Sequence, residues 1–262
     1  MISGNADSPL LRAEGLTKHY GNTVGCEDVS LTLYEGEVLA VVGESGSGKS
    51  TLLSLLSTHL TPTRGRVLYR MRDGRERDVF DLTEAERRVL LRTDWGFVHQ
   101  DARLGLRMNI SAGGNVGERL MAVGWRHYGN IRQEAVDWLS RVEIAHDRID
   151  HRPTTFSGGM RQRLQIAKNL VTQPRLIFMD EPTGGLDVSV QARLLDLMRG
   201  LVADLGLAAI IVTHDLAVAR LLSHRIMVMR HGHVIEAGLT DQVLDDPHAP
   251  YTQLLVSSVL QV

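Results

Sequence analysis

An apolar run, a glycine-rich loop and a second apolar run follow one another between residues 37 and 57, and no other feature constrains the fold of the chain as much. Residues 37–42 are predicted to form a buried strand, and residues 49–57 the helix that follows it. The loop between them fits the pattern G-x-x-x-x-G-K-[ST] and reads Gly43-Glu44-Ser45-Gly46-Ser47-Gly48-Lys49-Ser50. This order of strand, loop and helix predicts an α/β protein that binds a nucleoside triphosphate.

The chemistry expected of the loop follows from its residue types. Its glycines let the backbone curl so that successive N–H groups point at phosphate oxygens. We expect Lys49 to reach the β- and γ-phosphates and Ser50 to offer its hydroxyl to Mg²⁺. The positive N-terminal end of the following helix faces the same anion. The alternative is a glycine-rich turn that binds nothing, and the complete match between a strand and a helix argues against it.

Composition excludes several classes of protein. With 262 residues, 43% of them hydrophobic, the chain can bury one large core, or a core with a smaller lobe. A net charge of −2 gives no overall attraction to nucleic acid, so no nucleic-acid partner is expected. The single cysteine, Cys26, excludes an internal disulfide and agrees with a reducing compartment. Residues 1–9 carry no secretion signal, and a cytoplasmic location is expected.

The hydrophobic pattern predicts an α/β fold with two additions. Apolar runs at 37–43, 175–180 and 208–213 have the continuous hydrophobicity of parallel strands covered on both faces. Residues 10–34 and a hairpin at 65–80 predict an N-terminal antiparallel layer. A helical stripe between residues 100 and 168, with no buried strand nearby, predicts an inserted helical lobe. The predicted single domain therefore has an α/β core from 1–99 and 169–262, and a lobe from 100–168.

Two carboxylates follow the second apolar run. Asp180 and Glu181 lie at the carboxyl end of a predicted buried strand, which is where α/β sheets bind their ligands. Asp180 can hold Mg²⁺ through water, and Glu181 can accept a proton from the water that attacks the γ-phosphate. Without the phosphate-binding loop, an exposed strand end would explain the pair equally well.

A second potential phosphate site is predicted at residues 157–159. Ser157 precedes a predicted helix, and Gly158 and Gly159 would leave backbone N–H groups exposed at its N-terminus. By itself, Ser157 is also explained as an ordinary helix cap. One chain seldom needs two phosphate sites for one nucleotide.

Taken together, these motifs resemble those of the ATP-binding-cassette (ABC) ATPases over nearly the whole chain. The resemblance implies a head-to-tail homodimer with two ATP molecules between the subunits, in which the Ser157 helix of one copy completes the site of the other. It also implies that Tyr20 stacks on adenine, that Asp187 crosses the dimer interface and that His214 contacts the γ-phosphate. Gln100 would contact Mg²⁺ and act as the hinge of the helical lobe.

The resemblance yields three sets of site residues. The catalytic set is Glu181, His214 and Gln100. The Mg²⁺ set is Ser50, Gln100 and Asp180. The ATP-binding set is Tyr20, Gly43, Glu44, Ser45, Gly46, Ser47, Gly48, Lys49, Ser50, Thr51, Ser157, Gly158, Gly159 and Asp187.

The residues between the motifs indicate what the ATPase serves. Residues 108–121, 126–129, 153–156 and 182–193 resemble the K-type ATPase subunits of bacterial carbon–phosphorus lyase systems. This implies a role in phosphonate breakdown on the lyase core complex, possible pairing with a second ABC subunit, and no permease. The alternative comes from residues 246–255, which resemble the ends of ATPases that serve peptide and nickel importers and would imply a membrane permease.

One surface is expected to face the partner. By composition alone, residues 111–117 read as a flexible glycine-rich loop. Our hypothesis is that this loop and four arginines, Arg103, Arg107, Arg119 and Arg126, contact the lyase core.

Overall fold

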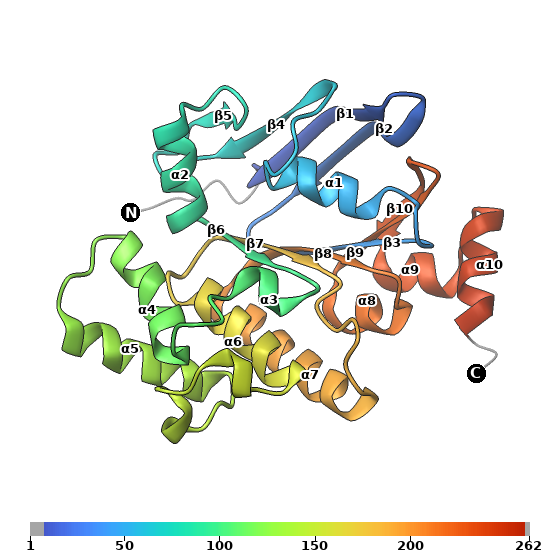
Figure 1. Ribbon diagram of the computed structural model, residues 1–262. Coiled ribbons are helices and arrows are strands. Elements are labelled where there is room, and N and C mark those ends of the chain that lie inside the picture. Colours follow the sequence, from blue (N-terminus) through green and yellow to red (C-terminus); the bar gives the residue numbers. More distant parts are fainter. Residues whose placement is uncertain (1–7, 260–262) are drawn as a thin grey trace. The chain divides into compact units, whose positions relative to one another are not determined.

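The computed structural model describes residues 8–259, so the expectation for residues 1–9 falls almost entirely outside it. The chain forms two compact units, Met1–Arg87 with Gly206–Val262 and Arg88–Leu205. Figure 1 shows their helices and strands. Between residues 8 and 259, no helix combines the length and the apolarity needed to cross a bilayer.

The first unit contains an antiparallel sheet with the strand order β2-β1-β4-β5. Its strands are β1 (Leu11–Tyr20), β2 (Thr23–Leu33), β4 (Arg64–Arg70) and β5 (Glu76–Asp78). The predicted hairpin is present, since β4 and β5 pair antiparallel around a turn at Gly74, whose φ of 83° suits glycine. The antiparallel layer expected from the sequence is therefore confirmed.

A second set of strands in this unit has the order β10-β9-β3-β8. The strands are β3 (Val38–Val42), β8 (Ala208–Thr213), β9 (Arg225–Arg230) and β10 (His233–Leu239). β3 runs parallel to both β8 and β9, and every residue of β3 and β8 is buried. This complete burial follows from cover on two faces, because α1 (Lys49–Leu56) packs on one face and α8 (Leu216–Leu222) on the other (Figure 1).

Two further helices finish the first unit. α9 (Thr240–Asp245) contacts β9 and β10, and α10 (Pro250–Val259) contacts α9 and β10. α1 also contacts β1 and β2, so the helix that follows the glycine-rich loop lies between the antiparallel sheet and the parallel strands.

The second unit pairs two parallel strands with a group of helices. β6 (Trp95–Val98) lies beside β7 (Leu176–Asp180), with Val98 opposite Met179. The helices are α2 (Glu84–Thr93), which begins in the first unit, α3 (Ala102–Gly105), α4 (Ala112–Ala122), α5 (Tyr128–Arg141), α6 (Gly158–Leu170) and α7 (Val188–Leu205). α6 contacts α3, α4, α5, α7 and β6, and is the centre of this unit.

The fold class predicted from the sequence is confirmed, whereas the local prediction for residues 111–117 is wrong. Ser111 caps α4 by accepting a hydrogen bond from the N–H of Gly114 at 3.2 Å, so the segment begins a helix and is not a flexible loop. Its glycines serve close packing. A Cβ at Gly113 would lie 2.6 Å from Ile149 Cγ1, and one at Gly117 would lie 2.7 Å from Ile131 Cγ2. The predicted bounds of the helical lobe, 100–168, stay a prediction.

Side-chain amides of α6 take the place of a neighbouring strand along β6. Asn169 accepts from the N–H of Phe97 at 3.0 Å and donates to its carbonyl at 2.9 Å. Gln165 does the same for His99, at 2.8 and 3.0 Å. Both amides are buried, and each satisfies one backbone donor and one acceptor that an edge strand leaves open.

Replacing either amide is therefore expected to destabilise the protein. Asn169→Leu or Gln165→Leu removes both partners of a buried backbone N–H and C=O, and should lower the free energy of unfolding by about 1–3 kcal/mol. Urea unfolding followed by circular dichroism measures the change. Gln133→Leu, on the exposed side of α5, is the matched control. Equal unfolding midpoints for Asn169→Leu and this control would contradict the role given to the amides.

Candidate functional site

The glycine-rich loop of the first unit runs from the end of β3 to the start of α1, and two of its glycines sit where no other residue fits. Gly48 caps α1 with a φ of 102°, and a Cβ there would lie 2.2 Å from the carbonyl oxygen of Gly25. Gly43 has a φ of 147°, and a Cβ there would lie 2.2 Å from the carbonyl oxygen of Met229. The loop is thus packed by its backbone against β2 and β9.

The lysine of this loop is folded back onto it. Lys49 is 5% exposed, and its Nζ donates to the carbonyl oxygens of Gly43 at 2.7 Å and Glu44 at 2.8 Å. These bonds offset the cost of burying an ammonium group. Because the first turn of α1 contains no acidic residue, the positive end of that helix is not neutralised from within.

Parallel register brings His214 beside the loop. β3 and β8 pair with Val42 opposite Thr213, so Gly43 and His214 leave the strands at the same edge. Asp215 then caps α8 by accepting from the N–H groups of Ala217 at 2.8 Å and Val218 at 3.4 Å. The cap fixes the backbone just after His214, whose side chain is exposed.

Tyr20 ends β1 on the same side of the unit. A Cβ at Gly25 would lie 2.8 Å from Tyr20 Cε2 and 3.0 Å from Thr51 Cγ2, so the ring and the first turn of α1 flank one point. Half of the Tyr20 side chain is exposed, and Lys18 Nζ lies 5.7 Å from its ring centre. An accessible aromatic face beside the glycine-rich loop suits a planar base.

The first unit therefore fits a nucleoside triphosphate. It combines a glycine-rich loop with no room for a Cβ at Gly43 or Gly48 and the buried ammonium group of Lys49, which bonds to that loop. The exposed Ser50 lies at the start of α1. Hydroxyl oxygens of this kind suit a hard cation such as Mg²⁺.

In the second unit, three other predicted residues, Gln100, Asp180 and Glu181, lie at the carboxyl ends of β6 and β7. β6 and β7 are in register with Val98 opposite Met179, so Gln100 and Glu181 each follow two residues later at the same ends. A Cβ at Gly184 would lie 3.0 Å from Gln100 Nε2 and 3.2 Å from the carbonyl oxygen of Glu181. Glu181 has a φ of 44°, a left-handed conformation that is uncommon outside glycine and turns the chain sharply after Asp180.

The Ser-Gly-Gly segment lies against the start of α7. Ser157 Oγ accepts from the N–H of Met160 at 3.3 Å and caps α6. A Cβ at Gly159 would lie 2.4 Å from Val190 Cγ1. The carbonyl of Asp187 accepts from Val190 and Gln191 at the first turn of α7, so Asp187 and the glycine pair are joined through Val190.

Each unit has supporting residues that the sequence patterns do not indicate. Gln162 and Gln165 hold the backbone of His99, directly before Gln100, by donating to its carbonyl at 3.2 and 3.0 Å. Two amides three residues apart on a helix whose face is otherwise apolar are the signal that could have drawn attention to them. Tyr251 bonds to the glycine-rich loop from α10, and no local pattern indicates that contact.

A hollow, which we call the cationic hollow, lies within the second unit. Its volume is about 410 Å³, and its charged lining residues are Arg92, Arg107, Glu118, Arg119 and Lys168. Glu118 pairs with Arg107 at 2.8 Å and with Lys168 at 3.5 Å. Burial lowers the pKa of Lys168, Glu118 opposes that shift, and repulsion from Arg119 and Arg107 adds to it. One carboxylate thus faces four cations, and the hollow is suited to an anionic group.

The four arginines predicted to face a partner have different surroundings. Arg103 pairs with Asp101 at 2.7 Å, and Arg126 donates to the carbonyls of Met121 and Trp125. Arg119 donates to the carbonyls of Leu91 and Trp95, so its guanidinium ties α4 to β6. Among the four, Arg107 and Arg119 line the cationic hollow.

Known proteins resemble this chain in sequence and in fold. A model of the ABC transporter family matches residues 26–184. The putative phosphonates utilization ATP-binding protein PhnK of Escherichia coli K12 is 64% identical over 97% of this chain and 99% of that protein. The dipeptide transport ATP-binding protein DppF of the same organism is 36% identical over 95% of this chain and 76% of that protein.

Solved structures of ATP-binding cassettes are similar to this chain in fold. A dimeric post-hydrolysis state of the ATP-binding cassette MJ0796, bound to ADP and phosphate, superposes with a TM-score of 0.77 at 30% identity, over 88% of this chain and 98% of that one. The cbiO1 protein of Clostridium perfringens, part of the transporter complex cbiONQ, superposes with a TM-score of 0.78 at 28% identity, over 98% of this chain and 96% of that one.

The contact between Gly159 and Val190 can be tested by a double-mutant cycle. Gly159→Ala places a methyl group against Val190 Cγ1 and should lower the free energy of unfolding by about 1–3 kcal/mol. Val190→Ala removes that Cγ1, so the double variant should lose less than the sum of the single changes. Thermal unfolding of the four proteins measures the coupling. Additive losses would show that the two residues do not meet.

Proposed function

The chain belongs to the ABC transporter family, and from this membership we propose that it couples ATP hydrolysis to phosphonate utilisation. The observation that carries the proposal is 64% identity with the phosphonates utilization protein of Escherichia coli over nearly the full length of both chains. Peptide-transport relatives share 34–38% and extend beyond this chain, which covers 72–79% of them.

We propose roles for the residues of each unit. In the first unit, Lys49 and the loop N–H groups bind the β- and γ-phosphates, Tyr20 stacks on adenine and His214 contacts the γ-phosphate. In the second unit, Glu181 accepts the proton of the attacking water, held in place by its left-handed backbone. Mg²⁺, when bound, neutralises phosphate charge; its proposed ligands are Ser50, Gln100 and Asp180.

The proposed working form is a head-to-tail dimer of this chain. In it, Ser157, Gly158 and Gly159 of one copy bind the ATP held by the other, and Asp187 crosses the interface. Support comes from the similarity to cassettes solved as dimers. The hydrogen bond from Met160 to Ser157 Oγ orients that hydroxyl at the helix terminus, where a phosphate would be attracted.

The proposed general base yields a direct test. Glu181→Gln keeps the size of the side chain but loses its basicity, so ATP should still bind while hydrolysis falls by about 10²–10⁴-fold. With ATP present, the variant should also elute as a stable dimer in gel filtration. Phosphate release gives the rate, and Asp204→Asn on the exposed side of α7 is the matched control. An undiminished rate in Glu181→Gln would remove this residue from the role of base.

We further propose that the partner is the core of a carbon–phosphorus lyase complex, in a cytoplasmic assembly that a second ABC subunit could join. The residues that carry this are those at 108–121 and 182–193, within the region of high identity. The alternative is a permease of a peptide or nickel importer, which the transport relatives and residues 246–255 favour.

The cationic hollow is our candidate for the partner surface. Its excess of positive charge suits an acidic segment of the partner, and within residues 8–259 the guanidinium of Arg92 has no hydrogen-bond or ion-pair partner that would neutralise its charge. Leu104, 75% exposed at the same hollow, adds an apolar contact.

Charge reversal tests this surface. Arg92→Glu with Arg107→Glu should abolish co-purification with lyase-core subunits from phosphonate-grown bacteria, while basal ATP hydrolysis is unchanged, because neither residue belongs to the ATP site. Arg75→Glu, on an exposed turn of the antiparallel sheet, is the matched control. Unchanged recovery of the core would refute the surface, and recovery of integral membrane permeases by the native protein would replace the phosphonate proposal by the importer alternative.

A further inference from the structure

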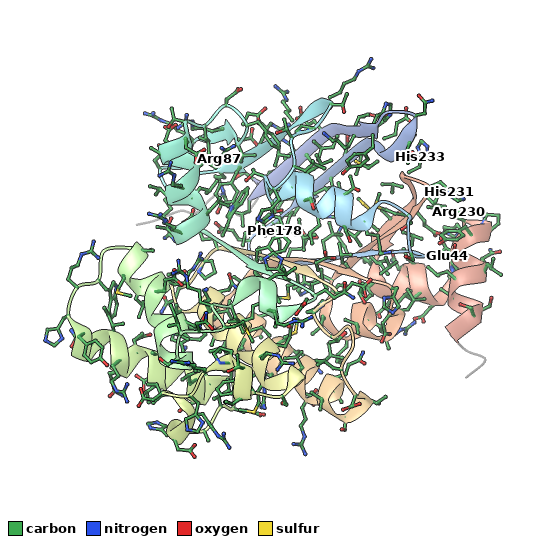
Figure 2. The ribbon with its side chains drawn as sticks, in the orientation of Figure 1. Glu44, Arg87, Phe178, Arg230, His231 and His233 are labelled. Carbon is green, nitrogen blue, oxygen red and sulfur yellow. The ribbon has the colours of Figure 1, made fainter. Side chains whose placement is uncertain are left out.

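Tyr251 contacts the glycine-rich loop although it lies 207 residues later in the sequence. It lies in the first turn of α10 and is 6% exposed. Its hydroxyl oxygen accepts a hydrogen bond from the backbone N–H of Glu44 at 3.2 Å. The guanidinium of Arg230 stacks on the ring, 4.7 Å from its centre, and Figure 2 shows Arg230 and Glu44 near one another beside α10. Tyr251 is thus held between the end of β9 and the loop.

The bonded N–H belongs to the peptide group that also holds the lysine. The carbonyl of Gly43 and the N–H of Glu44 are the two polar ends of one planar unit, so fixing one end fixes the direction of the other. The carbonyl end accepts from Lys49 Nζ at 2.7 Å. Tyr251 therefore sets the orientation of the carbonyl that anchors the Lys49 ammonium.

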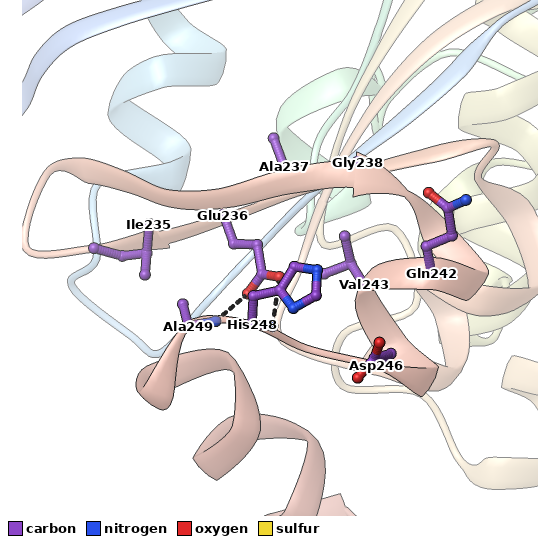
Figure 3. Close-up of a pocket in the computed structure, with 9 residues that line it drawn as sticks. All are labelled: Ile235, Glu236, Ala237, Gly238, Gln242, Val243, Asp246, His248 and Ala249. Atoms are coloured by element: carbon purple, nitrogen blue, oxygen red, sulfur yellow. Dashed lines mark hydrogen bonds between the residues drawn. The ribbon is translucent and has the colours of Figure 1, made fainter.

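The position of Tyr251 is itself fixed by β10. The carboxylate of Glu236 accepts from the N–H groups of His248 at 2.9 Å and Ala249 at 3.0 Å, just before α10 begins at Pro250 (Figure 3). Ala40 and Val42 of β3 pack in the same apolar cluster as Tyr251. A chain of contacts thus runs from β10 through the start of α10 to the loop.

We propose that Tyr251 is a positioning residue of the ATP site, which acts through the Gly43–Glu44 peptide to hold Lys49 in place for the β- and γ-phosphates. The inference rests on the proposed function, in which Lys49 binds those phosphates. It adds the C-terminal helix to the parts of the molecule that determine nucleotide affinity.

The test removes one oxygen atom. Tyr251→Phe keeps the ring, its stacking with Arg230 and its apolar contacts, but leaves the N–H of Glu44 without its acceptor. Affinity for ATP and ADP, measured by isothermal titration calorimetry, should fall about five-fold, the factor that corresponds to a hydrogen bond of about 1 kcal/mol. Affinity for AMP, which lacks the phosphates that Lys49 contacts, should stay within about two-fold of the native value.

Two controls separate the possible outcomes. Leu255→Ala loosens the packing of α10 on the same apolar cluster without touching the loop, so a general destabilisation would change ATP affinity in this variant as well. Lys49→Ala tests the premise. If it bound ATP normally, the proposed function of the loop would fail. If it lost binding while Tyr251→Phe matched the native protein, only the role of Tyr251 would be refuted. Equal losses for ATP and AMP in Tyr251→Phe would also refute it.

A second variant tests the same proposal if Tyr251→Phe does not fold. Arg230→Met removes the stacked guanidinium and leaves the hydroxyl in place, so the ring is held less firmly. It should weaken ATP binding by about two- to five-fold, the factors that correspond to the roughly 0.5–1 kcal/mol contributed by such a stacked contact. Unchanged ATP affinity in a folded Arg230→Met protein would count against the proposal.

Discussion

The close approach of backbones at Gly43 and Gly48 is the constraint on which the first unit depends. At each position a Cβ would meet a carbonyl oxygen at 2.2 Å, one on β9 and one on β2. The loop is therefore part of the packing between two sheets as well as the proposed nucleotide site. Its shape is fixed before any nucleotide arrives, which reduces the entropy lost when one binds.

Electrostatics in the two units are arranged differently. In the first unit a buried ammonium group and the N-terminus of α1, where no side chain accepts a capping hydrogen bond, concentrate positive charge at the end of β3. In the second unit, carboxylates and an amide gather where β6 and β7 end. Hydrolysis of a phosphate anhydride needs both kinds of group, because positive groups hold the reacting anion while a base accepts a proton from the attacking water.

Features that depend on neighbouring residues were predictable from the sequence, and those that depend on distant ones were not. The strand before Gly43, the helix after it and the hairpin at Gly74 follow from local patterns and are present as predicted. The composition of residues 111–117 does not indicate the helix that begins at Ala112, because glycine disfavours helices, a preference that close packing against Ile149 and Ile131 overrides here. The bond from Glu44 to Tyr251 joins residues 207 positions apart, and no periodicity records such a contact.

The amides along β6 have an effect beyond the stability of one molecule. A strand with open N–H and C=O groups is a template onto which another polypeptide can add, and long edges of this kind promote aggregation. Asn169 and Gln165 occupy those groups at Phe97 and His99 with side chains of the same molecule. A second copy consequently finds no free ladder at these two residues, which helps many copies to remain dispersed in a crowded solution.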